Sequence, residues 1–89
     1  MARFYFASRL RAVAPPDGQS FAGLTVGEAL GSAFAMAPLL RSYVLDEFGA
    51  LRKHVAIFVD DERAPNEVAL KAPLKAASTV YVMQALSGG

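Results

Sequence analysis

The sequence contains no cysteine, which excludes disulfides, thiolate metal sites, iron–sulfur ligation and a cysteine nucleophile. Charge is also scarce. Only 19% of the residues are charged, and the formal net charge of +1 provides no basic field of the kind that nucleic-acid binding needs. Hydrophobic residues make up 54% of the chain, which is not the composition of a disordered segment. We therefore expect a folded domain with no nucleic-acid partner.

Long hydrophobic runs are missing as well. The most apolar stretch, residues 33–40, is too short to span a bilayer and is interrupted by Pro38. Arg3, Arg9 and Arg11 interrupt the N-terminal segment before a signal peptide can form. We expect a soluble, cytoplasmic protein without a membrane partner.

The most informative stretch is the end of the sequence. Residues 80–85 are rich in β-branched and aromatic side chains and predict a strand. Two glycines, Gly88 and Gly89, end the sequence, and without a Cβ they can enter a channel too narrow for other residues. Taken alone, this ending is better explained as a frayed terminus or a truncation scar than as a functional arm. The length of 89 residues leaves room for one core, so we expect one domain over residues 1–85 and a flexible tail over residues 86–89.

The N-terminal part predicts a hairpin. Residues 3–10 alternate as in a strand, with Phe4 and Phe6 facing inward. Residues 15–18 (Pro-Pro-Asp-Gly) predict a turn, and residues 19–23 a short second strand.

A helix follows the hairpin. Thr25 is a candidate N-cap, with Glu28 three residues later to complete a capping box, and Pro38 ends the helix. Gly27 and Gly31 weaken the helix but allow it to lie close to a sheet. Its apolar stripe consists of Val26, Ala29, Leu30, Ala33, Phe34 and Ala37.

The C-terminal half is expected to be mostly strand and loop. Residues 39–46 predict an irregular segment that ends in a short strand over 42–45, followed by a turn at 46–49. Residues 54–59 are the clearest strand. Residues 64–73 predict a loop with a single helical turn.

The last strand alternates between the two faces of the expected sheet. Val80 and Val82 face the core, and Tyr81 and Met83 face outward.

Four segments, in this order, resemble the sulfur carriers of the MoaD/ThiS type. They are Phe6-Ala7-Ser8-Arg9-Leu10-Arg11, residues 51–62 (LRKHVAIFVDDE), Ala72-Pro73-Leu74-Lys75 and the ending Ala85-Leu86-Ser87-Gly88-Gly89. The extra residues after the helix make the chain more similar to the longer, MoaD-like branch. The resemblance implies an α+β, ubiquitin-like β-grasp fold, in which a mixed sheet of four to five strands curls around one main helix. In this fold the first and last strands are parallel neighbours.

The resemblance also implies the chemistry. A ubiquitin-activating-type enzyme would adenylate the Gly89 carboxyl with ATP and Mg²⁺, and a sulfur donor protein would deliver a persulfide sulfur. Gly89 would then carry a thiocarboxylate, while Gly88 provides clearance in the partner's channel. The acceptor would be an enzyme such as the large subunit of molybdopterin synthase. On this interpretation the chain is a cosubstrate, is not itself an enzyme, has no catalytic residues and binds neither cofactor nor metal.

Candidate docking residues lie near the tail. Outward-facing apolar side chains beside it suggest an interface, and two arginines are expected near its exit if the outer strands are parallel. The alternatives are that Tyr81 and Met83 pack under residues 39–49 and that the arginines are solvated. The candidates are Leu86, Ser87, Tyr81, Met83, Arg9 and Arg11.

The remaining polar residues have simpler interpretations. His54 is expected to be a surface or packing residue, and residues 60–62 (Asp-Asp-Glu) to solubilise a turn, not to bind a cation. Lys71 and Lys75 are either isopeptide acceptors or solvated loop residues.

Two other functions stay open from the sequence. The chain could be a ubiquitin-like modifier conjugated through Gly89 to lysines, or a β-grasp binding module whose tail is incidental. The destination of any sulfur is also open, since molybdopterin, thiamine thiazole, cysteine and thiolated RNA are all served by such carriers.

Overall fold

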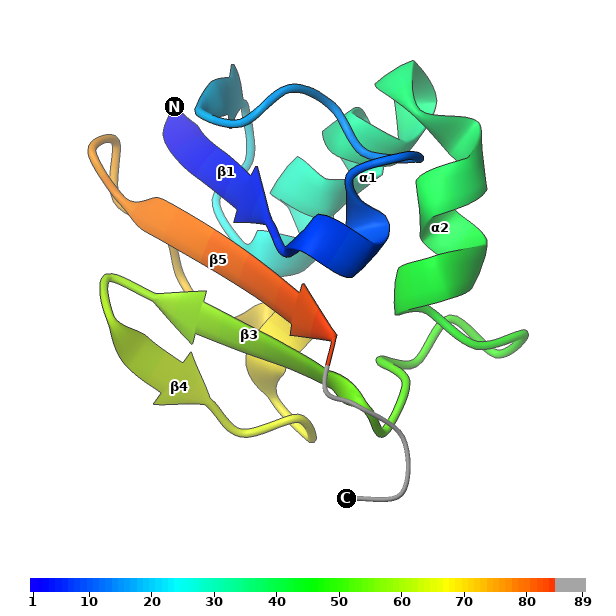
Figure 1. The fold of residues 1–89 in the computed structure, drawn as a ribbon. Helices are drawn as coiled ribbons and strands as arrows, with labels where there is room; N and C mark the ends of the chain where they lie inside the picture. The colour runs from blue at the N-terminus through cyan, green and yellow to red at the C-terminus, as the bar shows by residue number, and fades with distance from the viewer. Residues whose placement is uncertain (85–89) are drawn as a thin grey trace.

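The computed structural model describes residues 1–84. These residues form one sheet of five strands with two α-helices and two short 3-10 helices (Figure 1). The strands are β1 (Ala2–Phe6), β2 (Gln19–Phe21), β3 (Val55–Val59), β4 (Glu62–Ala64) and β5 (Thr79–Gln84). The helices are α1 (Val26–Met36), α2 (Pro38–Val44), η1 (Ser8–Leu10) and η2 (Ala69–Lys71).

The sheet has the strand order β2-β1-β5-β3-β4, with β5 in the centre. β1 and β5 run parallel, pairing Phe4 with Val80 and Phe6 with Val82, whereas the other neighbouring pairs are antiparallel. This is the predicted β-grasp arrangement, with its first and last strands adjacent and parallel.

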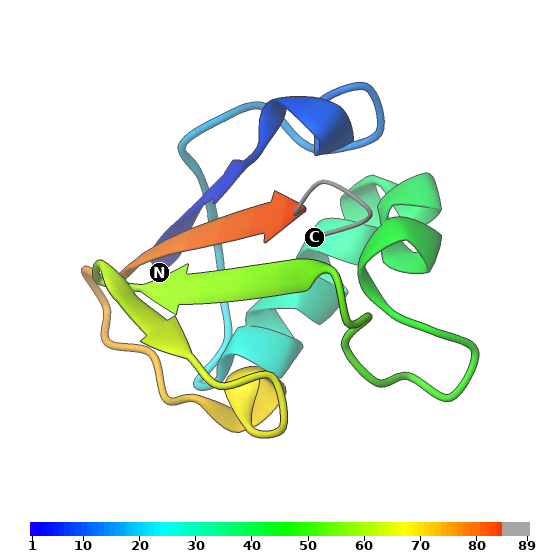
Figure 2. The same ribbon diagram turned by 60° about the horizontal axis from the view of Figure 1, so that its bottom comes forward.

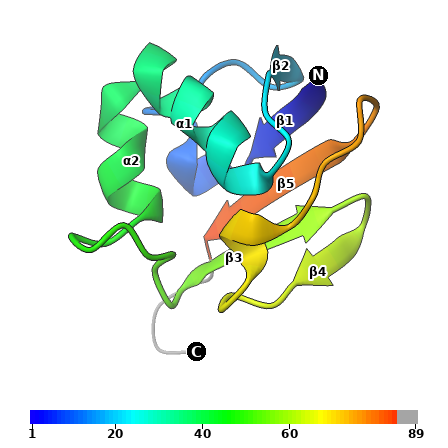
Figure 3. The same cartoon turned by 180° about the vertical axis from the view of Figure 1, so that it is seen from behind.

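One face of the sheet carries the helices. Seen from behind, α1 crosses in front of β1 and β5, and α2 lies beside α1 (Figure 3). Burial of the apolar side chains between these layers supplies the main stabilising free energy of the domain. The largest fully buried side chains are Phe4, Phe6, Leu10, Leu30, Leu40, Ile57, Val26, Val44, Val55, Val80 and Val82. None of the helices within residues 1–84 is long and apolar enough to cross a membrane.

The start of α1 is capped much as predicted. The Glu28 backbone N–H donates to the Thr25 hydroxyl oxygen at 3.2 Å. In turn, the Glu28 carboxylate accepts from the backbone N–H of Leu24 at 3.0 Å, one residue before the N–H that a regular capping box uses. Pro38 ends α1 as predicted, and it is also the first residue of α2, where its missing N–H costs nothing.

The first strand is shorter than predicted. The expectation of a strand over residues 3–10 is wrong beyond Phe6, because the chain turns there into η1. The backbone N–H of Ala7 still donates to the Val82 carbonyl at 2.9 Å, and the 3-10 turn then places Leu10 in the core.

The short strand predicted over residues 42–45 is also wrong. Residues 38–44 are helical, and Leu40 and Val44, four residues apart, are both buried against the core as the helical repeat requires. Leu45 makes only an isolated bridge to Leu51.

The β3–β4 hairpin turns at Asp60 and Asp61, whose φ angles of 50° and 71° are left-handed. Asp tolerates this conformation better than most residues. Residues 62–64 form β4, so the predicted loop over 64–73 begins one residue too early, whereas its single helical turn is present as η2.

The prediction that both helical glycines lie against the sheet is wrong. A Cβ on Gly27 would lie 2.9 Å from the backbone oxygen of Leu70, so its close neighbour is η2. A Cβ on Gly31 would have no neighbouring atom within 4 Å, because Gly31 is on the solvent side of α1.

Candidate partner-docking face

The face of the sheet opposite α1 presents a row of aromatic side chains. The strand register places Tyr5 of β1 beside Tyr81 of β5, and Tyr81 beside Phe58 of β3. The rings of Tyr5 and Tyr81 are stacked, with their centroids 5.4 Å apart. Figure 1 views the sheet from this face, with β1, β5 and β3 side by side. The row therefore crosses the three central strands.

Tyr81 and Met83 point outward as predicted. Their exposed fractions are 46% and 43%, and together with Phe58 and Asp61 they line a shallow depression of about 230 Å³. The alternative that they pack under residues 39–49 is wrong, because this exposure leaves them uncovered. Exposed apolar side chains gathered in one place are typical of an interaction surface.

Two segments, the start of β3 and η1, flank the C-terminal end of β5, which we call the β5 exit. β5 is described to Gln84, which pairs with Val55 at the start of β3, and η1 follows the end of the parallel strand β1 (Figure 2). Arg9, in η1, is exposed at this end. Arg11 is also exposed and forms an ion pair with Asp17 at 2.9 Å. The other predicted site residues, Leu86, Ser87, Gly88 and Gly89, lie outside the described residues, as does the predicted domain boundary after Ala85.

The histidine, aspartate and lysines considered in the sequence analysis are either exposed or hydrogen-bonded within the fold. His54, the residue before β3, is exposed. The Asp60 carboxylate accepts from the Thr79 backbone N–H at 2.9 Å and from the Ser78 hydroxyl at 3.1 Å, which ties the hairpin to the start of β5. Within residues 1–84 no three His, Asp or Glu side chains are grouped so that they could hold a metal ion. Lys71 and Lys75 are exposed.

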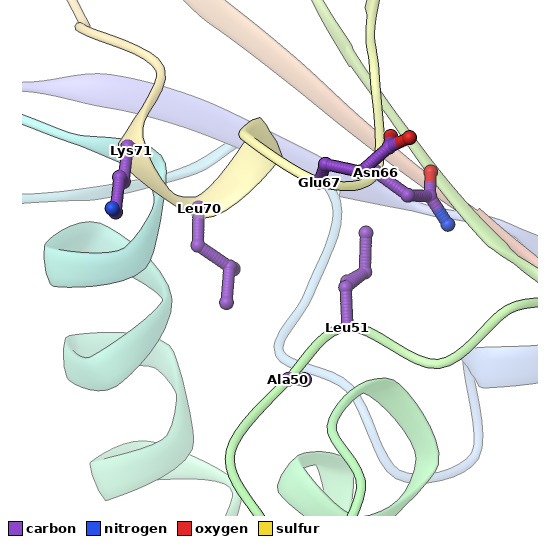
Figure 4. A pocket seen from close by; sticks show the side chains of 6 residues that line it. All are labelled: Ala50, Leu51, Asn66, Glu67, Leu70 and Lys71. Carbon is purple, nitrogen blue, oxygen red and sulfur yellow. The ribbon is translucent and has the colours of Figure 1, made fainter.

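A second cavity, of about 320 Å³, lies between η2 and the loop after α2 (Figure 4). Leu51 and Leu70 extend into the space between these two segments, and Asn66 lies at one side. The Asn66 side-chain amide donates to the Val55 carbonyl at 2.9 Å and to the Arg52 carbonyl at 3.4 Å. Its Oδ1 is buried and has no partner among the described residues. Asn66 therefore fixes the start of β3, next to the β5 exit.

Sequence reasoning missed Tyr5 and Phe58 as members of the docking face. The alternation of their strands indicated which side they face. Only the strand register, however, brings them beside Tyr81, and the register depends on contacts distant in sequence.

Neither a protein-family model nor a curated protein sequence matches this chain. Solved structures do match it. The crystal structure of the small archaeal modifier protein 1 (SAMP1) of Haloferax volcanii is 25% identical, with a TM-score of 0.75, and the match covers 99% of this chain and 98% of that one. A chain of the Amycolatopsis orientalis BexX/CysO complex is 20% identical, with a TM-score of 0.83 and complete coverage of both chains. Mycobacterium tuberculosis CysO, described as an antigen, is 20% identical, with a TM-score of 0.83 over 97% of this chain and 100% of that one.

These neighbours are ubiquitin-like sulfur carriers of the MoaD/ThiS type, so the resemblance in the sequence is confirmed. Residues 1–84 have the β-grasp fold of these ubiquitin-like proteins.

Proposed function

We propose that this chain is a sulfur carrier protein that is loaded at Gly89. The Gly89 carboxylate attacks the α-phosphate of ATP in an adenylating partner, which releases pyrophosphate and leaves an acyl adenylate. A persulfide sulfur of a donor protein then displaces AMP from the carbonyl carbon. Two thiols then reduce the resulting acyl disulfide. They leave a thiocarboxylate on Gly89, restore the donor's thiol and are themselves released as a disulfide.

One observation carries this proposal: the fold matches small carrier proteins from end to end, and the sequence following its central strand ends in Gly88-Gly89. A carboxylate is an anion at neutral pH and a poor electrophile, so it needs activation before sulfur can attack it. The docking face provides no catalytic constellation among the described residues. We therefore propose that a ubiquitin-activating-type partner activates the Gly89 carboxylate, using ATP and Mg²⁺.

The docking role of the open face is part of the same proposal. Tyr81 lies on the strand that leads to the tail, and its stacking on Tyr5 holds the ring in place. A partner that grips the tail is thereby brought against Tyr81, Met83 and Phe58. On this proposal Arg9, exposed in η1, meets acidic groups on that partner, and Arg11 does so by exchanging its ion pair with Asp17.

The absence of cysteine makes the experiment clean. The chain is incubated with a panel of purified adenylating enzymes of the ubiquitin-activating type, ATP, Mg²⁺ and a sulfide source, and is then treated with iodoacetamide. The chain has no thiol of its own, and its methionine thioethers react with iodoacetamide slowly and without ATP. Labelling that depends on ATP therefore reports a thiocarboxylate. We expect a labelled intact mass that requires ATP. A chain that stays unlabelled with every enzyme in the panel would overturn the proposal.

A ubiquitin-like modifier is the second candidate, favoured by the match to a small archaeal modifier protein. It shares the adenylation step, but a lysine amine captures the activated Gly89 instead of sulfur. Immunoblots of cell extract for the chain would then show bands of higher mass that resist thiols.

The acceptor of the sulfur and the place of the reaction belong to the proposal as well. A synthase large subunit, as in molybdopterin synthesis, is one acceptor, and the cytoplasm supplies the ATP. A binding module with an incidental tail would instead keep its activity when Gly88 and Gly89 are deleted.

A further inference from the structure

A phenylalanine stands almost fully exposed at the tip of the loop between α2 and β3. Phe48 has an exposed fraction of 87%, the highest among the large hydrophobic side chains of residues 1–84. No buried packing contact in the domain explains an aromatic residue at this position. Exposed aromatic side chains of this kind are enriched at the centres of protein interfaces.

The loop that carries Phe48 is fixed by hydrogen bonds. The Asp46 side-chain oxygen Oδ1 accepts from the backbone N–H of Phe48 at 2.8 Å and from that of Ala50 at 3.0 Å. The backbone N–H of Asp46 donates to the Ala50 carbonyl at 2.8 Å, and Gly49 adopts the left-handed φ of 81° that closes the turn. Because the loop is already ordered, Phe48 can enter a partner's pocket with little loss of conformational entropy.

This loop lies at the end of the molecule where β5 exits. Arg52 follows the loop, and its backbone N–H donates to the Val44 carbonyl at 3.0 Å. Three residues later Val55 pairs with Gln84, the last described residue of β5. Figures 1 and 3 both show the loop at the end of the sheet toward which β5 points.

Cationic residues lie on the segments at this end of the molecule. They are Arg9 in η1, Arg41 in α2, and Arg52 and Lys53 between the loop and β3. The Nε of Arg52 donates to the Ser42 carbonyl at 2.8 Å, which holds its guanidinium in place. The acids nearby are Asp46, which the loop uses internally, Glu47, and Glu67, which lines a cavity together with Ala50 and Leu51 of the loop.

None of these cations forms an ion pair within the described part of the chain. Among residues 1–84, the only ion pair joins Arg11 to Asp17. A surface of this sign attracts an acidic partner and raises its rate of association.

We propose that Phe48 and the cations around it, chiefly Arg9, Arg52 and Lys53, form a second docking element for the protein that receives the tail. This partner has an apolar pocket for the Phe48 ring and acidic side chains around that pocket. The inference rests on the proposed function, because it assigns a further contact to the enzyme that activates Gly89. This second docking element lies outside the open face of the sheet. It determines which partner can bind at the end of β5.

The test uses the full chain and the purified adenylating enzyme that loads it. ATP–pyrophosphate exchange is measured as a function of carrier concentration. Phe48→Ala is expected to raise KM about tenfold or more, with kcat nearly unchanged, because an interface anchor acts on binding and not on the chemistry. The matched control is Leu24→Ala, which removes a side chain that is 76% exposed, on the loop before α1.

The charge is tested in the same assay. Lys53→Glu is expected to raise KM and to weaken its dependence on salt, whereas Lys75→Glu, an exposed lysine before β5, leaves both unchanged. Circular dichroism of each variant confirms that the fold is retained.

The outcomes separate the two proposals. If the wild-type chain is loaded and Phe48→Ala is loaded with the same KM, the second docking element is overturned and sulfur carriage stands. If no enzyme loads the wild-type chain, both are overturned. Sedimentation with phosphatidylglycerol vesicles that depends on Phe48 would assign the loop to a membrane surface and would overturn a protein partner.

Discussion

The two faces of the central strands differ although their residues are adjacent in the sequence. Val80 and Val82 of β5 are fully buried under α1, whereas Tyr81 and Met83 between and beside them are about half exposed. The buried face explains why the chain folds. The open face is less buried and nevertheless apolar, which is typical of an interaction surface.

The two faces also differ in how far their aromatic rings are covered. In the core, Phe4 packs edge-on against Phe21, with the ring centroids 5.8 Å apart, and is stacked with Phe6 at 6.1 Å, and all three rings are buried. On the open face, Tyr5 and Tyr81 are also stacked, but Tyr81 remains 46% exposed. This comparison indicates that packing residues and exposed residues, which we propose as docking residues, alternate along the same strand.

Removing Gly89 should abolish loading without changing the packing of either face of the sheet. We expect the truncated chain to lose loading completely, because the carboxyl that is adenylated is then displaced by one residue. Its melting temperature should stay within about 1 °C of the wild type, since terminal residues outside the core contribute little to stability. Differential scanning calorimetry and the iodoacetamide assay measure the two properties. A large fall in melting temperature would mean that the end of the chain is structural.

Substitutions at neighbouring positions of β5 test the contrast between the buried face and the open face of the sheet. Val82→Ala leaves a cavity in the core and should cost about 2 kcal/mol of unfolding free energy, which lowers the melting temperature by roughly 10 °C. Met83→Ala, its matched neighbour, should change stability by no more than about 0.5 kcal/mol. Urea denaturation followed by circular dichroism would measure both. Equal losses would show that the open face is part of the core.

Tyr81→Ala tests the open face itself. We expect KM for the carrier in the exchange assay to rise about tenfold. The free energy of unfolding should fall by about 1 kcal/mol, because the stacking on Tyr5 is lost. Tyr81→Phe keeps the ring and should keep KM close to the wild-type value. If Tyr81→Ala has an unchanged KM, the partner does not touch this face.

The packed and open sides of α1 differ in the same way, with a smaller expected effect on stability. Gly31→Ala should stabilise the protein by somewhat less than about 1 kcal/mol, because alanine favours helix and its Cβ meets nothing within 4 Å. Gly27→Ala should destabilise it, since the new Cβ would lie 2.9 Å from the Leu70 carbonyl oxygen. Thermal denaturation of the pair decides the matter. Stabilisation by both changes would show that η2 moves aside freely.

Most of the fold could be predicted from the sequence, because the capping and alternation patterns of its longer elements agree with the tertiary structure. The capping residues Thr25 and Glu28, and the alternation of Val80 and Val82, predict the helix and the central strand correctly. The short elements were not predictable in this way. In α2 the seven residues are too few to show a helical period clearly, and Pro38 serves as a helix start as readily as a stop. In β4 the three residues Glu62, Arg63 and Ala64 pair with β3 because of the turn at Asp60, not because of their own pattern.

The candidate site was predictable only in part, for a related reason. Alternation alone placed Tyr81 and Met83 on the outer face. The row with Tyr5 and Phe58 needed the register of three strands, and Phe48 needed the hydrogen bonds that Asp46 makes in its loop. These features depend on contacts between residues that the local sequence does not relate.

The most direct test of sulfur carriage is to locate the sulfur within the loaded chain. After loading and alkylation, trypsin cuts behind Lys75 and releases residues 76–89, which contain no further lysine or arginine. Oxidation of Met83 in the same peptide adds about 16 Da, nearly the same as an oxygen-to-sulfur exchange, so the alkyl group and not the mass gain alone must be followed. Tandem mass spectrometry should place that alkyl group on Gly89 in the samples that received ATP. If the enzyme releases pyrophosphate in the presence of the chain and Gly89 remains unlabelled, the chain is adenylated but does not carry sulfur.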